Sequence, residues 1–140
     1  MLADPARCQV MLVTLPEETP VNELVDTAFA LEDRVGLKLG PVVVNAVPGD
    51  LALDGGSAAR DAEAAGVAPP GEAAALDAAA AFRHERHDLA LEQADRLAAR
   101  LPLPQLRLPF VFGEIGPTEV DRLADALADE IAALPDALAR

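Results

Sequence analysis

One asparagine stands where a run of three valines ends, and its side chain could recognise a ligand. Asn45 directly follows residues 42–44, and its carboxamide offers one acceptor and two donors in a single plane. Adenine presents a matching edge, because its ring N7 accepts a hydrogen bond and its N6 amine donates one. The alternative is that Asn45 caps the backbone of a loop, as asparagine often does after a strand. The sequence is compatible with both roles.

Two further groups of polar residues could do chemistry. Glu17 and Glu18 follow the end of an apolar run and could bind a metal or act as acid and base. Adjacent carboxylates before a helix also interact favourably with the positive N-terminal end of the helix dipole. His84 and His87 stand three residues apart, a spacing that could begin a zinc site. No cysteine lies near them, and the local arginines oppose a cation. We therefore expect a structural role for the glutamates and a solvated helix face for the histidines.

Several catalytic signatures are absent from the 140 residues. No Gly-x-x-x-x-Gly-Lys-Ser/Thr motif occurs, and Gly49 and the Gly55-Gly56 pair lack the lysine and hydroxyl that a phosphate-binding loop requires. The sequence has one serine, Ser57, outside any nucleophile motif, and one cysteine, Cys8. We expect no catalytic residue and no metal ligand, so this chain alone should not hydrolyse ATP.

Composition narrows the classes of partner. The chain has 11 basic and 24 acidic residues, a net charge of −13, and no basic stripe that could neutralise nucleic-acid phosphates or hold an anionic membrane. It has no Trp or Tyr for stacking on bases, and no apolar stretch near 18 residues. The sequence predicts a cytoplasmic protein with no nucleic-acid partner and no direct membrane insertion.

The first third of the chain alternates between strand and helix patterns. Residues 9–15 form an apolar run ended by Pro16, which predicts a strand buried on both faces. Thr19 is then the expected N-cap of an amphipathic helix that ends near Gly36. Residues 41–45 predict a second strand of the same type. Strand, helix and strand at this spacing predict a parallel βαβ unit.

The remaining residues predict a helical insertion followed by a third strand. Residues 46–71 are rich in Pro, Gly, Ala and Asp, with room for a short helix at 58–65. Residues 72–101 predict one long helix or two stacked ones. A short strand follows at 106–112, cut near Pro109, and a last amphipathic helix opens at residues 116–118.

Together these elements predict an α/β fold with a partial three-layer arrangement of about three parallel strands joined by helical crossovers. Parallel sheets are usually covered on both faces and contain more strands, so residues 1–140 should form a single partial α/β domain. Its helical, loop-rich insertion covers residues 48–100. Ligands of open α/β sheets sit beyond the carboxyl ends of the strands. The positions to inspect are therefore residues 14–19, 45–48 and 109–117.

Taken in order, several segments resemble the C-terminal part of the ArsA-like ATPases, the family of arsenite-pump ATPases and of the targeting factor for tail-anchored membrane proteins. Residues 2–7, 13–18 and 20–23 look like the strand and helix that follow the switch segments of that family. Residues 42–45 are similar to its strand with a terminal adenine-reading asparagine, and residues 108–115 look like its adenine loop. The matched blocks cover most of the chain outside residues 48–100.

The resemblance implies a function and a set of contacts. It implies the C-terminal part of a P-loop NTPase-like fold that binds the adenine of ATP through Asn45, Pro109, Phe110 and Val111. In the family, ATP hydrolysis serves anion transport or protein targeting, and the protein is a dimer. The P-loop lysine, the magnesium-binding aspartate and both switches have no counterpart here, so Mg²⁺ and phosphates would be bound by an N-terminal P-loop half.

Two functional hypotheses remain open. The chain is either the adenine-side portion of such an ATPase, or a non-catalytic interaction module that pairs through its sheet edge with a full-length paralogous ATPase. An exposed strand rich in β-branched residues is a ready template for such pairing.

Overall fold

The computed structural model describes residues 8–53, 56–67 and 71–135. In this part of the chain, three strands alternate with helices. The elements are β1 (Val13–Thr14), α1 (Glu18–Ala30) continued by the π-helical turn η1 (Leu31–Val35), β2 (Val42–Val47), α2 (Ala58–Ala64), α3 (Ala73–Arg100), β3 (Gln105–Pro109) and α4 (Pro117–Ala132).

The strands form one parallel sheet in the order β1-β2-β3, which confirms the mixed α/β class and the parallel βαβ unit expected from the sequence. Val13 pairs with Val43, and Val43 pairs with Leu106 on its other side. The register between β2 and β3 shifts between Val44 and Val47, so β2 continues past Asn45, two residues beyond its expected end.

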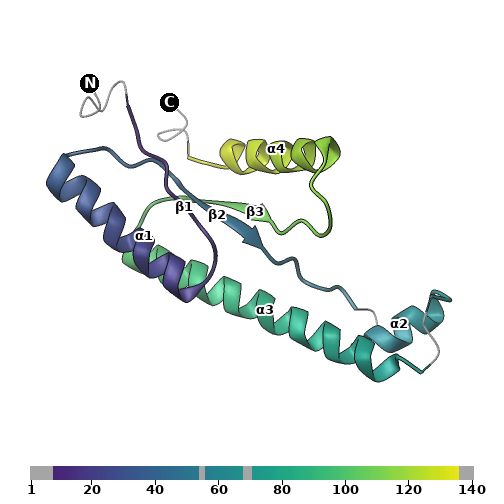
Figure 1. Ribbon diagram of the computed structural model, residues 1–140. Helices are drawn as coiled ribbons and strands as arrows, with labels where there is room; N and C mark the ends of the chain where they lie inside the picture. Colours follow the sequence, from purple (N-terminus) through teal and green to yellow (C-terminus); the bar gives the residue numbers. More distant parts are fainter. Residues whose placement is uncertain (1–7, 54–55, 68–70, 136–140) are drawn as a thin grey trace.

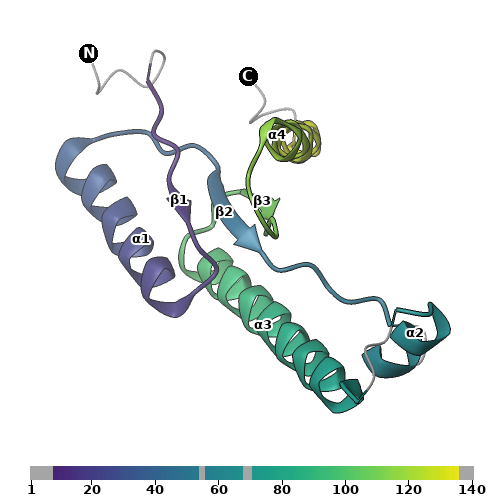
Figure 2. The ribbon, with the colours of Figure 1, turned by 45° about the vertical axis from the view of Figure 1, so that its right-hand side comes forward.

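The helices cover the two faces of the sheet unequally. Figures 1 and 2 show α1 and α3 on one face and α4 on the other, where α4 lies along β3. The face toward α1 and α3 holds the core, and Val21, Val25, Val44 and Leu97 are almost fully buried there. Burial of such side chains contributes roughly 1.5–3 kcal/mol each, so this layer holds the three strands to their helices.

The first strand differs from its expectation. Residues 9–15 were expected to be buried on both faces, yet the exposed fractions of Met11, Val13 and Leu15 are 49%, 62% and 41%. Their neighbours Val10 and Leu12 pack against the core instead. The reason is that α4 lies over β3 and no described helix lies over β1 on this face. The central strand does meet the expectation, because residues 42–44 are buried on both of its faces.

The first helix begins earlier than expected. Thr19 was expected to be its N-cap, but α1 starts at Glu18, and Glu17 takes the N-cap position without a side-chain hydrogen bond. Pro20 is therefore the third helical residue, where a missing N–H still costs nothing, because the first four N–H groups of a helix have no partner within it. At the other end, Gly36 adopts the left-handed conformation with φ 69°, as its position after the helix predicts.

The insertion forms an arm that extends from the sheet. The single helix α3 is 28 residues long, which decides between the two possibilities for residues 72–101, and α2 lies at its far end (Figure 1). The Asp77 carboxylate accepts hydrogen bonds from the Ser57 hydroxyl and from the Ala59 N–H, both at 3.0 Å. This contact attaches the start of α2 to α3, and it lowers the pKa of Asp77 below its ordinary value.

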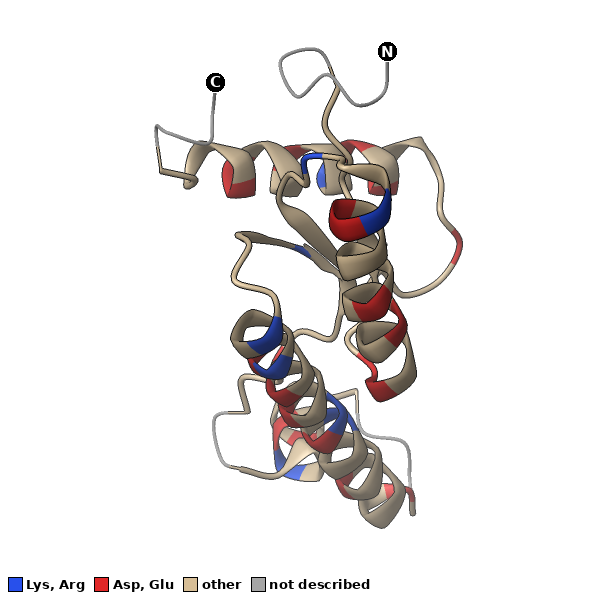
Figure 3. Cartoon of the chain, turned by 90° about the vertical axis from the view of Figure 1, so that its left-hand side faces the viewer, with Lys and Arg blue, Asp and Glu red and all other residues tan. Residues whose placement is uncertain are grey.

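Helix α4 carries five acidic residues and one arginine, whereas α3 carries five acidic residues and four arginines, so both signs of charge occur along α3 (Figure 3). Within the described residues, no helix combines the length and apolar character that crossing a bilayer requires.

Candidate functional site

The carboxyl ends of all three strands line one pocket. It has a volume of about 320 Å³, which lies at the lower end of the range for small-molecule sites. The loop after β1, the end of β2, the loop after β3 and the middle of α3 all contribute to its wall. The lining residues are Leu15, Pro16, Glu17, Ala46, Pro48, Phe82, Arg83, Arg86, Ala90, Phe110 and Phe112. We call this the strand-end pocket.

Aromatic rings and one guanidinium form one wall of the strand-end pocket. The rings of Phe110 and Phe112 meet edge to face with centroids 4.7 Å apart. The Arg83 guanidinium carbon lies 4.6 Å from the centroid of the Phe112 ring, a cation–π geometry. No described carboxylate lies within ion-pair distance of Arg83. Apolar rings beside an unpaired cation suit a flat, apolar ligand that carries a negative group.

A second arginine in the pocket is already paired. Arg86 donates to the Glu17 carboxylate at 3.2 Å, which ties α3 to the loop after β1. Glu18 lies 3.8 Å from Arg96, also on α3. The two glutamates therefore face different arginines and do not form a joint acid–base or metal site. The side chains of Glu17 and Glu18 are well exposed, so each ion pair stabilises the fold by less than about 1 kcal/mol.

The structure brings together only part of the residue set expected to bind adenine. Phe110 lines the strand-end pocket, and its N–H donates to the Val47 carbonyl at 2.9 Å, which fixes the start of the loop after β3. Pro109 ends β3 and is exposed, while the neighbouring Val111 is half-buried and does not line the pocket.

Asn45 lines a hollow next to the strand-end pocket, and Leu15 lines both. This hollow lies beside β1 and is also lined by Val13, Glu23 and Thr27. The next residue, Ala46, has φ 58°, the left-handed region that alanine rarely adopts, and it sits at the irregularity of the β2–β3 pairing. This irregularity carries the backbone past Asn45 and places Ala46, rather than Asn45, in the strand-end pocket.

Sequence reasoning missed the contribution of α3. Phe82, Arg83 and Arg86 reach the pocket from a segment that pattern analysis treats as an insertion. Their spacing of one helical turn places them on one face, but an amphipathic pattern alone cannot say which strand ends that face will meet.

The two histidines of α3 have different surroundings. The Nδ1 atom of His87 lies 2.7 Å from the Pro48 carbonyl, and because a carbonyl only accepts, this nitrogen carries the proton. His84 is exposed and lies 3.3 Å from an Asp50 oxygen. No cluster of three or more potential metal ligands occurs among the described residues. The expected solvated face holds for His84, whereas His87 is half-buried and fixes the chain after β2.

Comparison of the sequence with protein-family models and with curated proteins found no match.

Proposed function

We propose that this chain binds the adenine portion of an adenine nucleotide in the strand-end pocket, as the adenine-side portion of an ArsA-like, P-loop NTPase-like ATPase that serves anion transport or protein targeting. The observation that carries the proposal is the convergence of three parallel strand ends on one apolar, aromatic pocket. Open α/β sheets bind their ligands beyond the carboxyl ends of their strands. The resemblance of residues 108–115 to an adenine loop adds to it.

The pocket matches a base better than it matches a phosphate chain. A purine is flat and apolar on both faces, so it can pack on the rings of Phe110 and Phe112. Arg83 is the unpaired cation of the described pocket and can meet one negative group at its rim. Arg86 is neutralised by Glu17, whose own charge repels further phosphates.

Phosphate and Mg²⁺ binding would come from elsewhere. The 140 residues contain no P-loop motif, so we propose that a P-loop-bearing polypeptide holds the phosphates and the metal ion while this chain orients the base. A P-loop half or a paralogous ATPase would fill that role, and the family dimer is one such assembly. Hydrolysis would then require both partners.

The proposal is tested by titrating the purified chain with AMP while amide signals are followed by NMR. We expect the largest shifts at Phe110, Phe112 and Ala46, and weaker binding by the Phe110→Ala variant, since loss of one stacking ring costs about 1–3 kcal/mol. The control is Phe29→Ala, which removes a comparably exposed ring on α1, outside the strand-end pocket.

Unchanged binding by Phe110→Ala, or shifts centred on the hollow around Asn45, would refute the assignment of the base to this pocket. The Asn45→Ala variant completes the set. We expect it to bind AMP as the wild type does, because Asn45 does not line the strand-end pocket.

A further inference from the structure

The outer edge of β1 has backbone groups without partners. Val10 donates to the Lys38 carbonyl and accepts from the Gly40 N–H, and Leu12 accepts from the Val43 N–H, all at 2.9 Å. Because alternate residues of a strand point their backbone groups to opposite sides, those of Met11 and Val13 point away from β2. No described residue bonds to them, so two donors and two acceptors form an open edge.

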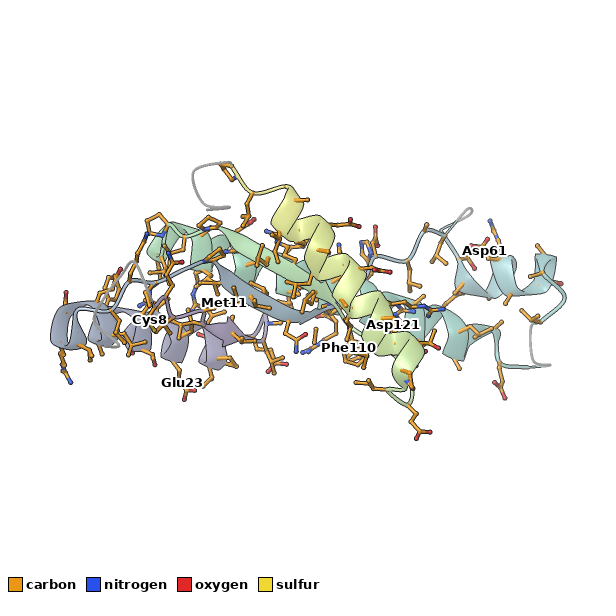
Figure 4. All side chains as sticks on the ribbon, turned by 90° about the horizontal axis from the view of Figure 1, so that it is seen from above. Cys8, Met11, Glu23, Asp61, Phe110 and Asp121 are labelled. Atoms are coloured by element: carbon orange, nitrogen blue, oxygen red, sulfur yellow. The ribbon has the colours of Figure 1, made fainter. Side chains whose placement is uncertain are left out.

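The side chains along this edge are apolar and uncovered. Met11, Val13 and Leu15 lie on the sheet face that α4 leaves free, and Figure 4 shows Met11 beside α4 rather than beneath it. Residues 8–15 contain no charged residue and no proline, which are the usual devices that keep a natural strand edge from pairing. This edge therefore lacks the usual protection against pairing with another strand.

One charge lies beside the open edge. Residues 12–15 line a hollow with α1, and Glu23 is the charged residue among those that line it. Glu23 is exposed, projects outward from α1 (Figure 4) and has no ion-pair partner among the described residues. A strand laid along Met11 and Val13 would pass next to this carboxylate, so a basic side chain on that strand would meet a counter-charge.

We propose that the β1 edge binds an extended segment of another polypeptide in which apolar residues alternate and one lysine or arginine faces Glu23. A second copy of this chain fits less well, because residues 8–14 carry no basic residue to meet Glu23, and each chain brings a net charge of −13. The added strand supplies main-chain hydrogen bonds for affinity, and the basic residue supplies specificity. This inference does not depend on nucleotide binding at the strand-end pocket.

The test uses two capped heptapeptides, Val-Thr-Val-Lys-Val-Thr-Val and the same sequence with Glu in place of Lys, titrated into the full chain by isothermal titration calorimetry. We expect the lysine peptide to bind about two- to fivefold more tightly, as an exposed ion pair allows. Glu23→Lys should reverse this preference. Hydrogen exchange should slow at the amides of Met11 and Val13 when the lysine peptide is bound.

Two variants distinguish peptide binding at the β1 edge from nonspecific hydrophobic binding. Val13→Pro removes an outward-pointing donor and keeps the hydrogen bond from the Val43 N–H to the Leu12 carbonyl, so it should reduce peptide binding at least about tenfold. Val35→Ala removes an exposed valine of η1 that lies outside β1 and does not line the hollow beside it, so this variant should bind as the wild type does. If circular dichroism shows that Val13→Pro is unfolded, Val13→Asp takes its place.

Equal affinity for both peptides, or unslowed exchange at Met11 and Val13, would overturn the proposal. A dimer seen by analytical ultracentrifugation and lost in the Val13 variant would also overturn it, in favour of a second copy as the occupant.

Discussion

The two edges of the sheet are treated in opposite ways. At the β3 edge, α4 lies along the strand, and its Glu130 carboxylate accepts a hydrogen bond from the Arg107 N–H at 3.0 Å. At the β1 edge, the backbone groups of Met11 and Val13 have no described partner, and the side chain of Val13 is 62% exposed. Both strands belong to one parallel sheet of the same chain, so the difference lies in what covers them.

The difference shows which edge of the sheet is protected from pairing with another strand. A side-chain acceptor placed on an edge N–H both satisfies the backbone and blocks the approach of another strand. The β3 side has this protection, and among the described residues the β1 side lacks it.

The largest contrast is expected between core and edge truncations. Leu106 in β3 is fully buried, and Leu106→Ala should lower the free energy of unfolding by about 2–5 kcal/mol, because it removes apolar contacts and leaves a cavity. Val13→Ala should cost less than about 1 kcal/mol. Urea denaturation of both variants measures the difference, and equal costs would mean that β1 is covered in solution.

A smaller effect is expected when the protection of the β3 edge is removed. Glu130→Ala should destabilise the chain by about 1 kcal/mol and should speed hydrogen exchange at the Arg107 amide. Asp129→Ala is the matched control, since the neighbouring carboxylate makes no hydrogen bond to β3. If Asp129→Ala has the same effect on exchange at Arg107, the edge is protected by α4 as a whole and not by this hydrogen bond.

Two left-handed residues, Gly36 after η1 and Ala46 within β2, should respond oppositely to exchange of alanine and glycine. Gly36→Ala should destabilise by about 1 kcal/mol, because a Cβ at φ 69° is strained even though no atom lies close to it. Ala46→Gly should stabilise by up to about 1 kcal/mol, since it relieves the strain already present at φ 58°. Thermal unfolding of both variants provides the check, and a loss of stability in Ala46→Gly would show that the alanine is not strained.

The smallest effect concerns the arm, away from both edges. Hydrogen bonds from Ala59 and Ser57 lower the pKa of Asp77. The stability that the ionised Asp77 carboxylate gives to the contact between α2 and α3 is therefore fully present above its ordinary pKa of 3.8. This contribution is lost as the pH falls through the lowered value. Hydrogen exchange at Ala59 should therefore quicken only at strongly acidic pH. The Asp77→Asn variant should not show this transition, and a transition that survives the substitution would assign the effect to another group.

Features of the fold that depend on local sequence patterns could be predicted, and features that depend on long-range packing could not. The parallel order of the strands and the short helix near residue 58 followed from turn residues and periodicity, which act over a few positions. Burial of β1 could not be predicted, because residues 9–15 look the same whether or not a helix lies over them. Only the placement of α4, settled by long-range packing on β3, leaves Met11 and Val13 exposed.

The candidate site was predicted by location rather than by residue. The rule that ligands sit beyond the strand ends selects a region in which the structure has a pocket lined by Phe110 and Pro16. It could not select Arg83 or Phe82, which come from a helix whose docking depends on long-range packing. Asn45 was chosen for its place after three valines, but the irregularity in the β2–β3 pairing moves the strand end past it.

Calorimetry of the purified chain with adenosine and with ATP tests directly whether the strand-end pocket binds the base alone. If the strand-end pocket binds the base and leaves the phosphates to a partner, the two affinities should agree within about tenfold, a difference of about 1.4 kcal/mol. Binding of ATP more than about a hundredfold tighter than adenosine would show that this chain itself holds the phosphates. No binding of either ligand would remove the strand-end pocket as an adenine site.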